Sequence, residues 1–153
     1  MNEYMSEAVR EAWNGIEKRE GGPFGSVIVK NGEIVGRGHN QVVYLKDPTC
    51  HGEVQAIRNA CKNLNTFDLS DCVLYTTGEP CPMCLTACMW ANIQKIYYGC
   101  TIADNAEIGF RDERFYNIIG ANEKAIAGYT ECIDREECQK LFAEYKKMKK
   151  TMY

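Results

Sequence analysis

The sequence lacks a hydrophobic run long enough to span a membrane. A transmembrane helix needs about 20 consecutive apolar residues, and no apolar stretch of this chain approaches that length. The first residues, MNEYMSEAVREAW, read as an amphipathic helix and lack the basic-then-apolar layout of a signal peptide. We therefore expect a cytoplasmic protein with no membrane partner.

The chain also lacks an excess of charge of either sign. Its 18 lysines and arginines stand against 21 aspartates and glutamates, for a net charge of −3. An acidic total provides no general electrostatic attraction to phosphate backbones. The one local exception is the basic run Lys146–Lys150, so nucleic acid is not an expected partner, although that run leaves a local contact open.

Histidine is scarce, with two residues, whereas cysteine is abundant, with nine. In a secreted protein of this size the cysteines would indicate a disulfide framework. Here the count is odd and nothing indicates secretion, so we expect reduced, buried thiols with a subset that binds metal. Structural disulfides remain the alternative.

The hydrophobic pattern predicts alternating helices and strands. We expect helices at about 1–20, 52–63, from Pro82 and at 136–150, and strands at FGSVIV, EIVGRG, CVLYTT, KIYYG and AIAGYTECI. Asn31-Gly32 suits the type I′ turn of a hairpin between the first two strands, and the stretch that follows KIYYG is expected to be a loop.

This order predicts an α/β protein. Strands separated by helices pair in parallel, while the opening hairpin adds an antiparallel pair. We expect a three-layer α/β/α fold with a mixed central sheet, formed by residues 1–153 as one domain. No internal repeat, linker or low-complexity segment divides the chain.

Two short motifs carry the chemistry. His51-Gly52-Glu53 and, further on, Pro80-Cys81-Pro82-Met83-Cys84 each stand where a loop runs into a predicted helix. A Cys-x-x-Cys pair alone also suits a redox dithiol or half of a structural zinc site. Together with His51, the two thiolates provide three Zn²⁺ ligands and leave one tetrahedral position open, which is typical of catalytic zinc.

The fourth position decides between a catalytic and a structural zinc site. Cys50 or Cys61 would have to fill it in a structural site. His39, the other histidine, is interpreted as a loop or sheet-edge residue, because a fourth protein ligand would abolish the chemistry. Glu53, two residues after a ligand, is then placed to accept a proton from water and return it to a substrate.

The combination His-x-Glu with Pro-Cys-x-x-Cys is the signature of zinc nucleobase deaminases. The chain resembles the cytidine-deaminase-like superfamily, and within it the bacterial guanine deaminases. The likeness lies in GGPFGSVIVKNG, DPTCHGEVQAIRNACKNLNTF, LYTTGEPCPMCLTACMWA and IADNAEIGFRD, with a terminal tyrosine. The last block favours the guanine enzymes, since the chain lacks the KTGAAGS-type loop of tRNA-adenosine deaminases.

This resemblance implies further site residues. Asn40 and Asp112 would hydrogen-bond the purine, and Phe24 and Trp90 would shape the pocket. Tyr153 would close the pocket from a partner subunit in a homodimer that swaps its C-terminal segment. We also count Gly52 with the substrate-binding residues; the family usually has alanine there, and Gly78 likewise replaces a cysteine of the guanine enzymes.

Each of these residues also has a structural interpretation. Trp90 lies at helical spacing with Ala87 and suits a core position, and Asn40 suits a turn after the second hairpin strand. Asp112 lies in a polar stretch where carboxylates are normally solvated. A terminal residue such as Tyr153 is normally frayed.

The resemblance implies conversion of guanine and water to xanthine and ammonia. A tRNA-specific adenosine deaminase is the first alternative, because the helix DREECQKLFAEYKKMKK resembles theirs. Cytosine deaminase is the second, because GRGHN and Gly52 are similar to the yeast-type enzyme. A zinc- or redox-regulated binding module is the non-enzymatic alternative, against which Glu53 beside an open metal position argues.

Overall fold

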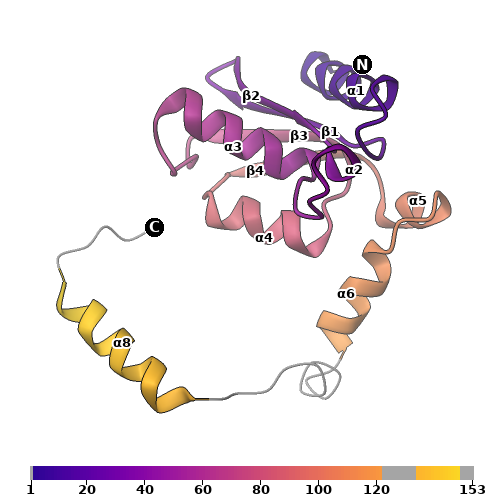
Figure 1. Cartoon of the computed structure of the whole chain (residues 1–153). Coiled ribbons are helices and arrows are strands. Elements are labelled where there is room, and N and C mark those ends of the chain that lie inside the picture. Colours follow the sequence, from indigo (N-terminus) through magenta and orange to yellow (C-terminus); the bar gives the residue numbers. More distant parts are fainter. Residues whose placement is uncertain (1, 122–133, 149–153) are drawn as a thin grey trace.

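The structure, a computed structural model, describes residues 2–121 and 134–148 (Figure 1). The helix α1 (Glu3–Glu17) is followed by the hairpin of β1 (Gly25–Lys30) and β2 (Glu33–His39). Asn31 and Gly32 both have positive φ, 50° and 81°, as a type I′ turn requires. The expected hairpin is therefore confirmed, together with the first helix.

A mixed sheet organises the described residues. The remaining strands are β3 (Cys72–Gly78) and β4 (Lys95–Cys100), and the sheet order is β2-β1-β3-β4. The strand β1 pairs antiparallel with both β2 and β3, while β3 and β4 pair in parallel. The parallel pair is joined by α4 (Pro82–Trp90), which makes the crossover that parallel strands need.

Helices cover both faces of this sheet. On one face, α1 approaches so closely that a Cβ at Gly25 would lie 2.2 Å from the carbonyl oxygen of Ala8. On the other, α3 (Gly52–Leu64) lies against β2, where a Cβ at Gly36 would lie 2.5 Å from the carbonyl oxygen of Ala56. Alternate residues of a strand face opposite sides, so the glycines of β1 and β2 let one helix approach each face.

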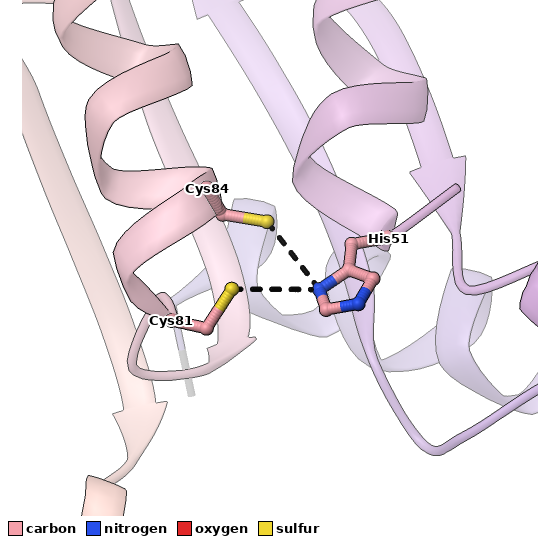
Figure 2. A group of neighbouring side chains, drawn as sticks. All are labelled: His51, Cys81 and Cys84. Carbon is pink, nitrogen blue, oxygen red and sulfur yellow. Dashed lines mark hydrogen bonds between the residues drawn. The ribbon is translucent and has the colours of Figure 1, made fainter. Parts of the chain in front are cut away.

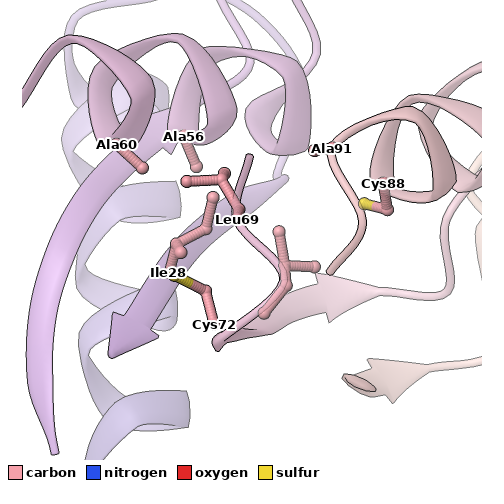
Figure 3. Close-up of a cluster of buried hydrophobic side chains, with 8 residues drawn as sticks. Ile28, Ala56, Ala60, Leu69, Cys72, Cys88 and Ala91 are labelled. Atoms are coloured by element: carbon pink, nitrogen blue, oxygen red, sulfur yellow. The ribbon is translucent and has the colours of Figure 1, made fainter. Parts of the chain in front are cut away.

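The main hydrophobic core lies between the sheet and the helices α3 and α4 (Figure 3). Small side chains of α3 meet Ile28 of β1 in this core, and Cys88 comes from α4. Its buried members are Ile28, Ala56, Ala60, Leu69, Cys72, Leu74, Cys88 and Ala91. Cys72 and Cys88 act here as small apolar side chains, and none of the seven cysteines from Cys50 to Cys100 forms a disulfide.

The stretch after β4 differs from the expected loop. It forms two helices, α5 (Ile102–Glu107) and α6 (Asp112–Ala121). Thr101 and Asp104 form a capping box at the start of α5, which satisfies backbone N–H groups that a helix start leaves unpaired. Phe115, Ile118 and Ile119 recur at helical spacing in α6. The polar residues that indicated a loop are in fact caps and first-turn residues.

Two further segments bear on the sequence expectations. The loop after β2 contains a short unexpected helix, α2 (Val42–Leu45), and the expected C-terminal helix is present as α8 (Arg135–Lys147). The strand expected at AIAGYTECI lies outside the described residues. None of the helices in the described part of the chain has the length and apolar character that a membrane span requires.

Candidate metal centre and substrate pocket

The helices α3 and α4 point their N-termini at one place. His51 is the N-cap residue of α3 and Cys81 is the N-cap residue of α4, both in extended conformation. Pro82 occupies the first turn of α4, where its missing N–H costs least, and Cys84 follows within the same turn. Partial positive charge at a helix N-terminus stabilises thiolate. The sequence expectation that both motifs open helices is confirmed.

The three side chains form one cluster (Figure 2). The Nδ1 atom of His51 lies 3.6 Å from Sγ of Cys81 and 3.5 Å from Sγ of Cys84, and all three ligand atoms lie within 4.8 Å of one another. Zinc bond lengths and tetrahedral angles place a nitrogen and a sulfur ligand about 3.6 Å apart. The donor set and the spacing of these residues fit a zinc ion.

The cluster has three members and no fourth within the described ranges. Cys50 is buried and its Sγ accepts from a guanidinium N–H of Arg58 at 3.4 Å, so it is engaged elsewhere. His39 ends the edge strand β2 and lies between two carboxylates, 3.1 Å from Glu11 and 2.5 Å from Glu20. Its interpretation as a sheet-edge residue outside the metal centre is confirmed.

Glu53 lies in the first turn of α3 and is 4% exposed. Burial raises the pKa of this carboxyl to about 7. A hydrogen bond from the Cys84 thiol is the largest of the effects that lower the pKa of Cys81, to about 4. In the metal-free cluster one thiol therefore ionises readily, and a carboxyl with a pKa near neutrality lies beside it.

A hollow of about 350 Å³ opens beside this centre. Phe24, Asn40 and Asp112, which the sequence associated with substrate, line it together with His51 and Glu53. The rings of Phe24 and Phe110 meet edge to face, with centroids 4.8 Å apart, and form an apolar part of the lining. The remaining lining residues are Gly22, Val42, Val43, Pro48, Glu79, Cys81, Arg111 and Phe115.

Asn40 and Asp112 are polar residues in the lining of this hollow, together with Glu53, Glu79 and Arg111. Asn40 is 4% exposed, and its Oδ1 accepts from the backbone N–H of Val42 at 3.1 Å. Asn40 therefore stabilises the turn after β2, as its structural interpretation expected, and it also lines the hollow. Asp112 begins α6, and burial raises the pKa of its carboxyl above the usual range.

A second, more apolar hollow of about 440 Å³ adjoins the first. It shares His51, Cys81 and Asp112 with the first and continues over side chains of α4 and α6. Its other lining residues are Pro48, Pro82, Met83, Arg111, Phe115, Ile118 and Ile119. The mouth of the metal centre therefore has an apolar rim.

Two residues that the sequence associated with substrate, Trp90 and Gly52, do not line this hollow, and a third is not among the described residues. Trp90 is 67% exposed at the end of α4 and lines a separate hollow with Met89. Gly52 is buried, and a Cβ there would lie 2.8 Å from the carbonyl oxygen of Phe24. Its backbone therefore packs closely against the backbone of Phe24, a residue that lines the pocket. Tyr153 lies outside the described residues.

The sequence analysis did not identify several residues of the site. Glu79, Phe110 and Arg111 line the hollow. Asn105 and Tyr116 contact the segment before Cys81 through hydrogen bonds to the carbonyl oxygens of Glu79 and Pro80. Glu79 adjoins the metal motif and Asn105, Phe110 and Arg111 lie in the block IADNAEIGFRD, so position in the sequence was the one available signal.

Comparison with known proteins agrees with this geometry. Residues 1–100 match the family model for the cytidine and deoxycytidylate deaminase zinc-binding region. The chain is 47% identical over 128 residues to the guanine deaminase of Bacillus subtilis, which covers 82% of each chain. It is also 47% identical to the tRNA-specific adenosine deaminase of Aquifex aeolicus, over 95 residues and 62% of each chain.

A solved structure gives the same result for the fold. The crystal structure of guanine deaminase from Bacillus subtilis aligns with a TM-score of 0.89 and 40% sequence identity. The alignment covers 100% of this chain and 99% of that one. The expected α/β/α fold with a mixed sheet, of the cytidine-deaminase-like type, is therefore confirmed.

Proposed function

We infer that this chain, which belongs to the cytidine and deoxycytidylate deaminase family, hydrolyses guanine to xanthine and ammonia with a zinc cofactor. The observation that carries this inference is one hollow whose lining joins His51 and Cys81 of the zinc-type cluster to the buried Glu53 and to Phe24 and Asp112. At the same 47% identity, the match to the guanine deaminase of Bacillus subtilis covers 82% of the chain, whereas the match to the tRNA-specific adenosine deaminase of Aquifex aeolicus covers 62%.

The residues divide the chemical work as follows. His51, Cys81 and Cys84 hold the zinc, which supplies an activated water as nucleophile when bound. Glu53 accepts a proton from the attacking water and delivers it to the ring nitrogen beside the amidine carbon. It then takes the proton of the hydroxyl newly formed on that carbon and passes it to the departing amine, so that a carbonyl and ammonia result. Phe24 contacts the purine ring, while Asn40 and Asp112 hydrogen-bond its polar edges.

A panel of substrates tests this function. We expect ammonia release from guanine to exceed release from cytosine, adenine and tRNA-borne adenosine. The reasons are that the chain is 47% identical to a guanine deaminase over 82% of its length and that its acidic total attracts RNA weakly. The assay measures kcat/KM for each compound with zinc-loaded protein. Faster formation of inosine in tRNA than of xanthine from guanine would instead favour the tRNA enzyme, whose similarity to this chain is also substantial.

We further propose that the active form is a cytoplasmic homodimer that exchanges the segment containing α8. In Figure 1, α8 stands apart from the sheet and from the helices around it. A short helix alone in water is marginally stable, so it needs a surface to pack against. Beside α1 the sheet offers Tyr97, which is 45% exposed and stacked on Tyr75 with ring centroids 4.8 Å apart.

The exchange would bring Tyr153 of a second copy to the pocket. The apolar rim formed by Met83, Phe115 and Ile118 provides a surface for such a tail. Covering the bound purine excludes water and strengthens the electrostatic effect of Glu53 and the metal centre. Trp90 remains a candidate wall of the pocket only if a second copy brings it there.

Deletion of residues 150–153 tests the tail. We expect zinc content and thermal stability close to those of the full chain, with guanine turnover lowered about tenfold or more because the base is less well oriented. Mixing the truncated chain with a Glu53→Ala chain should restore part of the activity, since a heterodimer then joins an intact centre to an intact tail. Full activity of the truncated chain, or an active monomer, would contradict the exchange.

A further inference from the structure

Asn105 is a fully buried polar side chain that lies behind the pocket rather than in it. It belongs to α5 and is 2% exposed. Its Nδ2 donates to the carbonyl oxygen of Glu79 at 3.2 Å and to the Oδ2 atom of Asp112 at 3.2 Å. A single amide thus connects the segment before the metal ligand Cys81 with the first residue of α6.

The end of β3 leaves room for this amide. A Cβ at Gly78 would lie 3.0 Å from the Asn105 Oδ1 atom and 3.0 Å from the ring of Phe24. A larger residue at position 78 would therefore press on both the pocket wall and the amide. Glycine at position 78 therefore leaves the space that the Asn105 amide and the Phe24 ring occupy.

The same contact acts on the charge of Asp112. Burial raises the pKa of this carboxyl, whereas the hydrogen bond from Asn105 opposes that change. A carboxylate that accepts an N–H from the protein keeps its ionised form and one orientation. Asp112 then presents an acceptor to the hollow that it lines.

We propose that Asn105 is a positioning residue that orients the Asp112 carboxylate for the N–H edge of a purine and so contributes to the selection of guanine. This inference rests on the proposed function. A second contact keeps α6 in place independently, because the Tyr116 hydroxyl donates to the carbonyl oxygen of Pro80 at 2.6 Å. Loss of the amide should therefore disturb the carboxylate more than the helix.

The test compares guanine with 2-aminopurine, which carries the same amino group on C2 but has no N–H at ring position 1. Asn105→Leu keeps a similar volume without hydrogen bonds. We expect it to raise KM for guanine about tenfold, the size of one hydrogen bond to a charged group. The inhibition constant of 2-aminopurine against guanine should change less than about twofold, because that base has no N1–H for the Asp112 carboxylate to accept.

A double-mutant cycle separates positioning from a structural role. In an Asp112→Ala background, Asn105→Leu should raise KM for guanine no further, since coupled residues are not additive. If Asn105→Leu folds poorly, Asn105→Asp serves instead: it is nearly isosteric, and its carboxylate repels Asp112, so KM should rise at least as much. Asn63→Leu is the matched control, because Asn63 also donates an amide N–H to a carbonyl, that of Val35, and should leave both constants unchanged.

The outcomes distinguish this inference from the proposed function. Equal losses for guanine and 2-aminopurine, or additive effects with Asp112→Ala, would show that Asn105 only maintains the fold and would overturn the inference alone. An Asp112→Ala chain with an unchanged KM for guanine would overturn the role of Asp112 and the inference with it. Absence of guanine deamination by the zinc-loaded wild-type chain would overturn the proposed function itself.

Discussion

Replacement of Glu53 by glutamine is expected to lower guanine turnover by at least about a hundredfold, with zinc and fold retained. The amide keeps the size and hydrogen-bonding capacity of the carboxyl but cannot carry a proton between water and substrate, and general acid–base catalysis contributes about 10²–10⁴ to rate. Steady-state kinetics with guanine, beside zinc analysis and thermal denaturation, measure this change.

The control for Glu53→Gln must show that the loss of turnover comes from lost proton transfer and not from replacing any carboxylate in the hollow. Glu79 also lines the hollow, but its carboxylate accepts from the backbone N–H of Ile102 at 2.9 Å and has no place in the metal motifs. Glu79→Gln keeps an oxygen acceptor for that N–H, so we expect a decrease much smaller than that of Glu53→Gln. Near-normal turnover in Glu53→Gln would mean that another residue moves the protons.

Replacement of Cys84 by alanine is expected to remove most of the bound zinc and to reduce deamination to background. The ion would keep two protein ligands, His51 and Cys81, and the binding free energy of zinc depends on the full set of deprotonated donors. Elemental analysis after dialysis should show about one zinc per wild-type chain and a small fraction of that in Cys84→Ala. His51→Ala should give the same result.

Cys88 provides a matched control on the same helix. It is one turn further along α4 and buried in the core, outside the cluster of His51, Cys81 and Cys84. Cys88→Ala should therefore lose some stability by its cavity while it keeps its zinc. Full zinc retention in both His51→Ala and Cys84→Ala would refute the ligand assignment.

The elements around the metal centre could be predicted from sequence because their signals are local. A type I′ turn needs positive φ at Asn31 and Gly32, and Pro82 suits only the first turn of α4. The stretch after β4 could not, because the residues of a capping box, Thr101 and Asp104, are also common in loops. The helix α6 was also hard to predict. Its apolar residues Phe115, Ile118 and Ile119 are partly exposed, so they do not form the buried face by which a helix is usually recognised.

The binding residues show where family resemblance reaches its limit in one chain. Phe24, Asn40 and Asp112 line one hollow, as the resemblance implied. Trp90 does not enter it, because the end of α4 turns that side chain outward. A short motif specifies which residue types are present. Whether a side chain at the end of a helix faces the pocket or the solvent depends on how the helix packs against its neighbours.

By itself the sequence singled out the candidate zinc ligands, because the side chains of His51, Cys81 and Cys84 suit zinc and their motifs stand where a loop runs into a helix. Only the tertiary structure decided what surrounds them. The edge-to-face wall of Phe24 and Phe110 and the Asn105 link between Glu79 and Asp112 each join residues from different elements. Such contacts depend on how helices pack on the sheet, and packing is decided by the whole set of side chains rather than by a local pattern.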